Sequence, residues 1–390
     1  RSSCNFFRSL GLDYLYVGEG NDIPSLVAAF AKVKDTSRPT VVHIHTQKGK
    51  GYAPAEADRE EFHWEMPFDL ETGKPKVDCS GMEDYHSLTG KFLLEKMKED
   101  HTVVAISSGT PTVIGFTPER RKQAGRQFVD VGIAEEHAVA LASGIAAGGG
   151  RPVYGVYSTF IQRCYDQLSQ DLCINGNPAV ITVFMGTVAG MNDVTHLGFF
   201  DIPLISNIPN MVYLAPTCSE EYFAMLEWAV RQTEYPVAIR VPGVAVVHRK
   251  EEFDTDYSEL NRYKMTARGE TVAILALGSF YDLGQALKNK LREESGVEAT
   301  LINPRYITGL DEPMLEELKV GHRIVVTLED GVLDGGFGEK IARYYGNSEM
   351  RVLNYGLRKE FADRYNLDEL MKTNRLTDKQ MAEDIAGILE

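Results

Sequence analysis

Two adjacent carboxylates and a histidine stand where an apolar run meets an Ala-rich stretch, in FVDVGIAEEHAV (128–139). Apolar residues recur at helical spacing after them, so we expect Glu135, Glu136 and His137 at the start of a helix. Acidic residues there commonly only complement the helix dipole, at about 0.3 to 1 kcal/mol each. The alternative is a carboxylate facing an apolar cleft, where loss of water raises its pKa and lets it share a proton with a ligand nitrogen. From this stretch alone the first interpretation is the simpler one.

A second set of chemically capable residues follows a strand-like run in GVYSTFIQRCYDQL (155–168). Tyr157, Phe160 and Arg163 offer a hydroxyl, an aromatic face and a guanidinium close together in the chain. At the carboxyl end of a parallel strand, such a set suits a flat ring and an anion. A packed phenylalanine with a surface arginine is the alternative.

Three glycines surround Asn192, Asp193 and His196 in GTVAGMNDVTHLGFFDIP (186–203). Loops on a rigid scaffold often carry binding groups, and glycines permit close approach of the backbone to a ligand. We therefore predict a functional loop here, although a histidine in a loop is often only solvated.

Two further stretches carry weaker patterns. The segment 43–63, HIHTQKGKGYAPAEADREEFH, lacks the order of a phosphate-binding loop, and LEDGVLDGGFGEKIA (328–342) lacks a dinucleotide fingerprint. His43 and His45 could share one strand face, but no carboxylate or cysteine stands at a suitable spacing. We predict no metal ligands in this chain.

Short β-rich runs alternate with helical segments throughout, which favours consecutive parallel-sheet α/β domains. A length of 390 residues indicates two or three domains. The formal net charge of −15 argues against a nucleic-acid partner, and the apolar runs are shorter than the roughly 20 residues of a membrane span. Five scattered cysteines fit the reducing cytoplasm.

The motifs, taken in order, resemble those of thiamine-diphosphate-dependent enzymes of the transketolase group. The resemblance rests on HIHTQKGKGYAPAE with His63 following, VDVGIAEEHAV, VYSTFIQRCYDQ, THLGFFDIPLISNIPNM and LEDGVLDGGFGEK. It implies the end of a diphosphate-binding domain with a linker (1–77), a pyrimidine-binding domain (78–245) and a transketolase C-terminal domain (246–390). It also implies a homodimer that uses thiamine diphosphate and Mg²⁺. Within the group, it implies the enzymes that condense pyruvate with the aldehyde acceptor glyceraldehyde 3-phosphate.

The resemblance also implies roles for single residues. Glu135 matches the glutamate that hydrogen-bonds the aminopyrimidine ring and promotes proton removal from the cofactor. The implied catalytic residues are Glu135, His63 and His196; the cofactor contacts are Tyr52, Glu135 and Phe160; the substrate contacts are Tyr157, Arg163, Asn192, Asp193 and Arg240.

Two departures from the family pattern leave alternatives open. No Gly-Asp-Gly sequence, which the family uses for Mg²⁺ and the diphosphate, occurs in the 390 residues. We therefore expect that part upstream of Arg1 or on a separate chain, which would make this chain a partner half. Met185 stands where an arginine would grip the acceptor's phosphate, Asn192 replaces the usual aspartate, and Arg240 lacks the second arginine of its motif. A different, non-phosphorylated acceptor is the other alternative.

Overall fold

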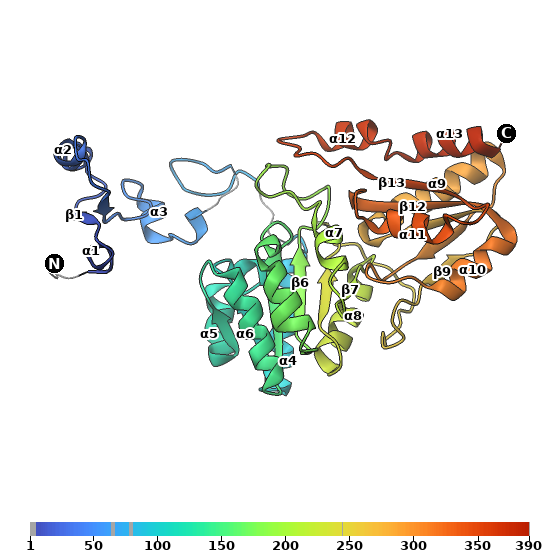
Figure 1. Ribbon diagram of the computed structural model, residues 1–390, viewed down its shortest axis with the longest axis horizontal. Helices are drawn as coiled ribbons and strands as arrows, with labels where there is room; N and C mark the ends of the chain where they lie inside the picture. The colour runs from blue at the N-terminus through green and yellow to red at the C-terminus, as the bar shows by residue number, and fades with distance from the viewer. Residues whose placement is uncertain (1–4, 64–66, 78–80, 244, 390) are drawn as a thin grey trace. The chain divides into compact units, whose positions relative to one another are not determined.

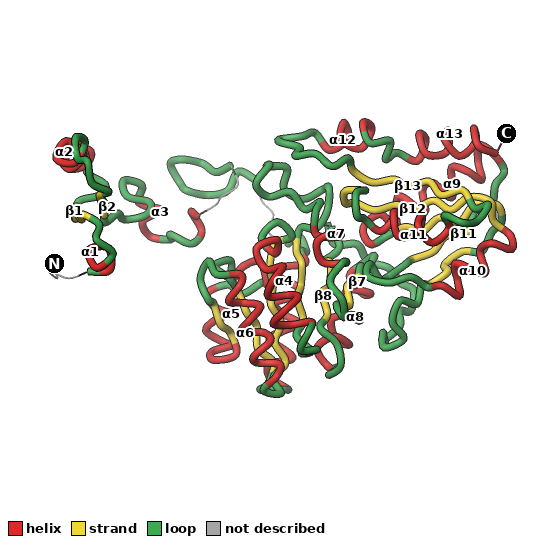
Figure 2. The backbone as a smooth tube through the Cα atoms, in the orientation of Figure 1, coloured by secondary structure: helices red, strands yellow, loops and turns green. Residues whose placement is uncertain are grey.

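The computed structural model describes residues 5–63, 67–77, 81–243 and 245–389. The chain divides into two compact units, Arg1–Met82 and Glu83–Glu390. Each unit has strands and helices of its own (Figures 1 and 2).

Unit 1 is a small β–α–β arrangement. Strands β1 (Asp13–Val17) and β2 (Thr40–Ile44) pair in parallel and are connected through helix α2 (Ile23–Val33). Asp22 begins α2, because its carboxylate accepts the Ser25 N–H at 2.9 Å and satisfies a free donor of the first turn. The short helical segments are α1 (Phe6–Ser9), α3 (Ala53–Ala57) and η1 (Glu61–His63).

The first sheet of unit 2 has six strands in the order β4-β3-β5-β6-β8-β7, and all neighbours run parallel. Its central strands are mostly apolar and buried, as expected for a sheet covered by helices on both faces. The strands are β3 (Val103–Ser107), β4 (Phe128–Asp130), β5 (Arg151–Tyr157), β6 (Val180–Phe184), β7 (Val212–Leu214) and β8 (Val237–Arg240). The helical segments are α4 (Tyr85–Glu99), η2 (Pro111–Ile114), α5 (Pro118–Ala124), η3 (Gly125–Gln127), α6 (Glu135–Ala147), η4 (Ile161–Cys164), the π-helix η5 (Gln167–Cys173), α7 (Asp201–Ser206) and α8 (Ser219–Arg231).

The second sheet has five strands in the order β13-β12-β10-β11-β9, and only β9 runs antiparallel to its neighbour. The strands are β9 (Lys264–Ala267), β10 (Thr271–Ala276), β11 (Thr300–Asn303), β12 (His322–Val332) and β13 (Arg351–Leu357). The helical segments are η6 (Gly278–Phe280), α9 (Tyr281–Ser295), α10 (Glu312–Gly321), α11 (Phe337–Tyr345), α12 (Leu367–Thr373) and α13 (Asp378–Leu389).

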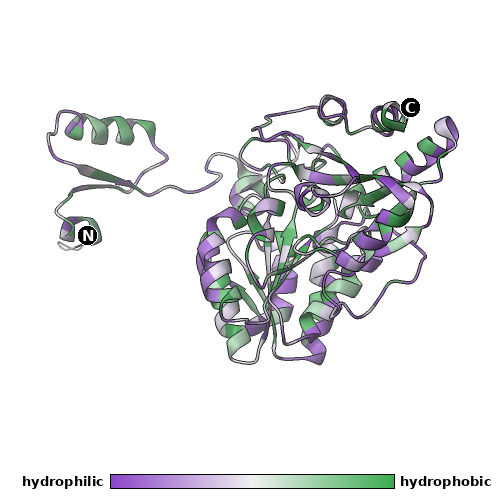
Figure 3. Ribbon diagram, turned by 45° about the vertical axis from the view of Figure 1, so that its right-hand side comes forward, coloured by the Kyte–Doolittle hydropathy of each residue, from purple (hydrophilic) through white to green (hydrophobic). Residues whose placement is uncertain are grey.

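One apolar core joins the two sheets of unit 2. It contains Ile202 and Ile205 of α7 together with Leu275 of β10 and Phe337 and Ile341 of α11. Figure 3 shows apolar residues concentrated on the strands, while the helices carry both kinds of residue. The two sheets are therefore packed as one body.

The predicted fold class, consecutive α/β domains with parallel sheets, is confirmed. The predicted boundary at 77/78 lies near the division between the units, whereas the predicted boundary at 245/246 lies inside unit 2. Strands β9 and β13 and helices α12 and α13 were not predicted. No helix in the described ranges is long and apolar enough to cross a membrane.

Candidate functional site

Glu135 is the first residue of α6, directly after β4 and its turn. Gly132 has a φ of +73°, which lets the chain turn from the strand into the helix. The Glu135 side chain is only 4% exposed, whereas Glu136 and His137 are exposed. The structure therefore turns one carboxylate of the pair inward and leaves the other in solvent.

Arg163 is the ionic partner of Glu135. Its Nη1 lies 3.2 Å from Oε2 of Glu135, and the arginine side chain is 52% exposed. The guanidinium offsets the cost of burying the carboxylate. Among the described residues Arg163 is the only side-chain partner of this carboxylate, so Oε1 has capacity to accept a further donor.

Three aromatic rings stand in series beside this pair. Tyr157 ends β5, and its ring centroid is 5.7 Å from that of Phe160, which in turn is 5.4 Å from the ring of His196. Burial raises the pKa of the Tyr157 phenol. Phe160 directly precedes η4, which carries Arg163. The structure thus brings Glu135, Tyr157, Phe160, Arg163 and His196 together at the carboxyl ends of β4 and β5.

The loop that carries His196 is held by internal contacts. The carboxylate of Asp193 accepts the hydroxyl and the N–H of Thr195, and these bonds lower the pKa of Asp193. Oδ1 of Asp193 is 3.7 Å from Nδ1 of His196. The amide of Asn192 points elsewhere and donates to the carbonyl of Tyr365 at 3.1 Å.

Arg240 has a different environment from the one expected of a substrate contact. It is buried, its Nε lies 2.7 Å from Oδ2 of Asp201, and its Nη1 pairs with Asp330. Nη2 donates to the carbonyls of Gly198 and Asp330 at 3.3 Å. These acceptors inside the protein occupy the guanidinium, which therefore lies within the packed junction between the two sheets.

Tyr52 and His63 belong to unit 1. The Tyr52 ring packs edge-on to Phe62 at 5.6 Å, and its buried hydroxyl has no hydrogen-bond partner among the described residues. His63 ends η1 and contacts the ammonium of Lys48 through Nδ1. An orphaned buried hydroxyl is a group that a ligand could satisfy.

Sequence reasoning missed Asp201, Asp330 and Tyr365. Asp201 and Asp330 are fully buried acids that each end or interrupt an apolar run, FFDIP and VVTLED. An acid in such a run needs a partner, and that signal could have pointed to Arg240. Within the described ranges, no group of three or more His, Cys, Asp or Glu side chains is placed to hold a metal ion.

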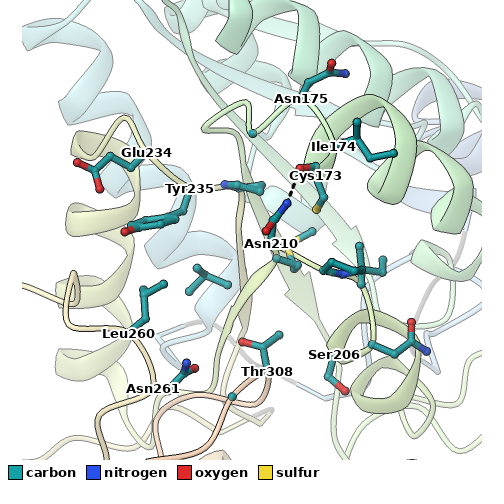
Figure 4. A pocket seen from close by; sticks show the side chains of 18 residues that line it. Cys173, Ile174, Asn175, Ser206, Asn210, Glu234, Tyr235, Leu260, Asn261 and Thr308 are labelled. Carbon is teal, nitrogen blue, oxygen red and sulfur yellow. Dashed lines mark hydrogen bonds between the residues drawn. The ribbon is translucent and has the colours of Figure 1, made fainter.

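A cavity of about 570 Å³ lies at the opposite edge of the first sheet (Figure 4). Its lining includes Asn210 and Tyr235, which precede β7 and β8. Leu260, just before β9, and Thr308, just after β11, also line it. In parallel sheets ligands bind beyond the carboxyl ends of the strands. This cavity is at the amino ends and is separate from the site around Glu135.

Two family models match the chain. The transketolase pyrimidine-binding domain matches residues 83–246, and the transketolase C-terminal domain matches residues 262–381. Among solved structures, a split-gene transketolase described as an inactive β4 tetramer has a TM-score of 0.64 at 22% identity, covering 79% of this chain and 98% of that one. A Pichia stipitis transketolase in complex with sedoheptulose 7-phosphate has a TM-score of 0.62 at 14% identity, covering 97% of this chain and 67% of that one.

Curated relatives extend the likeness. The chain is 35% identical to 1-deoxy-D-xylulose-5-phosphate synthase of Clostridium beijerinckii over 378 residues, which is 95% of this chain and 59% of the relative. It is 34% identical to the protein of the same name from Clostridium acetobutylicum, covering 98% and 60%. The chain thus spans about three fifths of the length of these relatives. With both domain models matched in succession on a transketolase fold, the chain belongs to the transketolase family.

Proposed function

We propose that this chain provides the pyrimidine-side part of a thiamine-diphosphate-dependent transferase that condenses pyruvate with glyceraldehyde 3-phosphate. The product would be 1-deoxy-D-xylulose 5-phosphate, the compound in the name of its relatives. One observation carries the proposal: among the described residues, only Arg163 contacts the buried Glu135 carboxylate, so one oxygen is free for a ligand near Phe160 and His196.

The residues present fit the ring half of this cofactor. A buried acid with a free acceptor suits a nitrogen-bearing ring, and the half-buried Phe160 offers a face for stacking. Among the described residues, no group of three or more His, Cys, Asp or Glu side chains is placed to supply the ligands of Mg²⁺. We therefore propose that those ligands come from residues other than the ones described.

The chain's own residues would then have separate roles in binding the cofactor and moving protons. Thiamine diphosphate supplies, when bound, the nucleophilic carbon that no side chain provides. Glu135 accepts a hydrogen bond from the ring at its free oxygen, Phe160 orients the ring, and Arg163 balances the carboxylate's charge. His196 lies beside Phe160, where its imidazole can move a proton to or from the substrate.

The test is Glu135→Ala, with Glu136→Ala as the matched control, in the complete enzyme. We expect kcat for deoxyxylulose phosphate formation to fall about 100-fold or more in Glu135→Ala, the range of a lost proton-transfer partner. Glu136→Ala should retain wild-type turnover, because its carboxylate is exposed. Melting curves check that both variants fold. Near-normal turnover of Glu135→Ala would remove the proposed role.

A different acceptor is the second candidate function, and the environment of Arg240 favours it. Its donors are engaged by Asp201 and Asp330, and the uncharged Met185 directly follows the neighbouring strand β6. Each missing charge-assisted contact would weaken phosphate binding by about one to two orders of magnitude. Comparing kcat/KM for glyceraldehyde 3-phosphate and glyceraldehyde decides between the acceptors, since a preference for the free aldehyde selects the second.

A partner-half role remains as a further proposal. The split-gene transketolase, described as an inactive β4 tetramer, is matched over 98% of its own length by 79% of this chain. If the enzyme is divided in this way, the chain alone has no turnover, and a second polypeptide restores it. The homodimer is likewise proposed and is tested by light scattering.

A further inference from the structure

Four hydrogen bonds join the loop 188–194 to the segment 363–365, although the two are far apart in the chain. The Tyr365 hydroxyl donates to the carbonyl of Val188 at 2.8 Å, and Nδ2 of Asn192 donates to the carbonyl of Tyr365 at 3.1 Å. The backbone N–H of Arg364 donates to the carbonyl of Asn192 at 2.6 Å. The backbone N–H of Val194 donates to Oδ1 of Asp363 at 3.2 Å. Side-chain and backbone groups of both segments take part in these bonds, so the loop is held at several points.

Aromatic packing supports the same junction. The Tyr365 ring lies 5.8 Å from that of Phe199, and Phe361 lies 5.7 Å from Phe200. Arg364 has a φ of +46°, a left-handed conformation that non-glycine residues keep only where neighbours enforce it. The backbone of the segment 363–365 is therefore shaped to meet the loop.

The other end of the loop meets the candidate site. Thr159 Oγ1 donates to the carbonyl of Thr195 at 3.1 Å, and the His196 ring packs against Phe160. The loop thus has one set of contacts in the C-terminal domain and another beside the residues that surround Glu135. A displacement at the first set would be transmitted to His196.

We propose that the segment 363–365 is a positioning element that fixes the loop 188–194 and thereby places His196 in the site. Asn192 is then a positioning residue, because its amide and carbonyl are both engaged by this segment. The inference about His196 rests on the proposed function, whereas the inference about the loop does not.

The first experiment measures hydrogen–deuterium exchange of peptides that contain residues 188–196 in the complete enzyme. Tyr365→Phe and Asp363→Ala each remove one bond to the loop, so we expect exchange about two- to tenfold faster there. Tyr345→Phe is the matched control, because its hydroxyl donates to the carbonyl of Leu315 at 2.7 Å in the same domain, without contact to the loop. Asp363→Asn keeps an acceptor oxygen and should restore slow exchange. Unchanged exchange in Tyr365→Phe and Asp363→Ala overturns the proposal.

The second experiment links the loop to the site. We expect kcat to fall severalfold in Tyr365→Phe while its melting temperature stays level with that of Tyr345→Phe, and we expect the rate of His196 modification by diethyl pyrocarbonate to change. Faster loop exchange with unchanged kcat and unchanged His196 modification refutes the link. If the wild-type enzyme forms no condensation product, the proposed function fails, and the exchange and modification rates still decide the positioning role.

Discussion

Burial separates side chains of the same type into different roles. Glu135 is inward and Glu136 outward, although they are adjacent. Arg163 is half exposed beside Glu135, whereas Arg240 is buried between two aspartates. The half-exposed arginine is accessible to an anion, whereas the donors of Arg240 are engaged by acceptors of the protein.

Arg240→Ala should destabilise the protein strongly. It leaves Asp201 and Asp330 as buried carboxylates without their cation, which costs about 3 to 5 kcal/mol. Arg268→Ala is the control, because Arg268 pairs with Glu317 at the surface and such a pair contributes about 1 kcal/mol or less. Urea unfolding followed by circular dichroism measures both. A normal midpoint for Arg240→Ala with a raised KM would instead indicate a substrate contact.

The sequence indicated roles for Glu135, Phe160 and His196 through the resemblance of its motifs to the transketolase group, and these roles stay predictions. It could not predict the environment of Arg240. The partner Asp330 is 90 residues away, and only the packing of the two sheets brings them together. Local pattern identifies a charged residue, whereas tertiary structure decides whether its charge is already satisfied.

Continuous apolar runs mark strands in a sequence more clearly than mixed runs do. Strands β3, β5, β6 and β10 consist mostly of buried residues, so each is a largely apolar run in the sequence. Strand β13 lies at the sheet edge and mixes Arg351 and Asn354 with apolar residues, so no clear pattern marks it. Antiparallel β9 is a short strand at the other edge.

His248 links two helices and the segment that follows β8. Its Nδ1 and Nε2 lie 2.7 Å from carboxylates of Glu220, in the first turn of α8, and Glu83, just before α4. The hydrogen bonds that the protonated ring donates to Glu220 and Glu83 raise the pKa of His248 above its usual 6.5. A raised histidine pKa stabilises the fold fully below pH 6.5, and the contribution disappears as pH rises through the folded-state pKa.

The difference in melting temperature between wild type and His248→Gln should therefore shrink between about pH 5.5 and about pH 8.5. This range extends from about one unit below to about two units above the usual histidine pKa. Lys98→Gln, which removes an exposed pair with Glu95, is the control and should show no such trend. A difference that stays constant with pH would mean that the protonated imidazole makes no contribution.

At the scale of the molecule, the two units differ in how much core they possess. In unit 1 the described buried apolar residues are Val17, Ala29 and Ala55, and α2 exposes Ile23, Val27 and Phe30. So few buried apolar side chains rarely offset the conformational entropy that a chain of this length loses on folding. Unit 2 has two helix-covered sheets with a common core.

Residues 83–390 expressed separately should therefore unfold in one cooperative transition, whereas residues 1–82 should show none. Calorimetry of the two fragments and the whole chain provides the measurement. A sharp transition in the short fragment would show that its few buried side chains suffice, and a broad transition in the long fragment would show that it depends on unit 1.

The ion pair between Arg240 and Asp330 has a consequence for domain exchange. One partner lies in the domain matched at 83–246 and the other in the domain matched at 262–381. A chimaera that takes its C-terminal domain from another enzyme would need an acid at the position of Asp330. Without that acid, the buried Arg240 would keep only Asp201 as an ionic partner. A C-terminal domain suitable for exchange can therefore be chosen by checking that its sequence has an acid at the position aligned with Asp330.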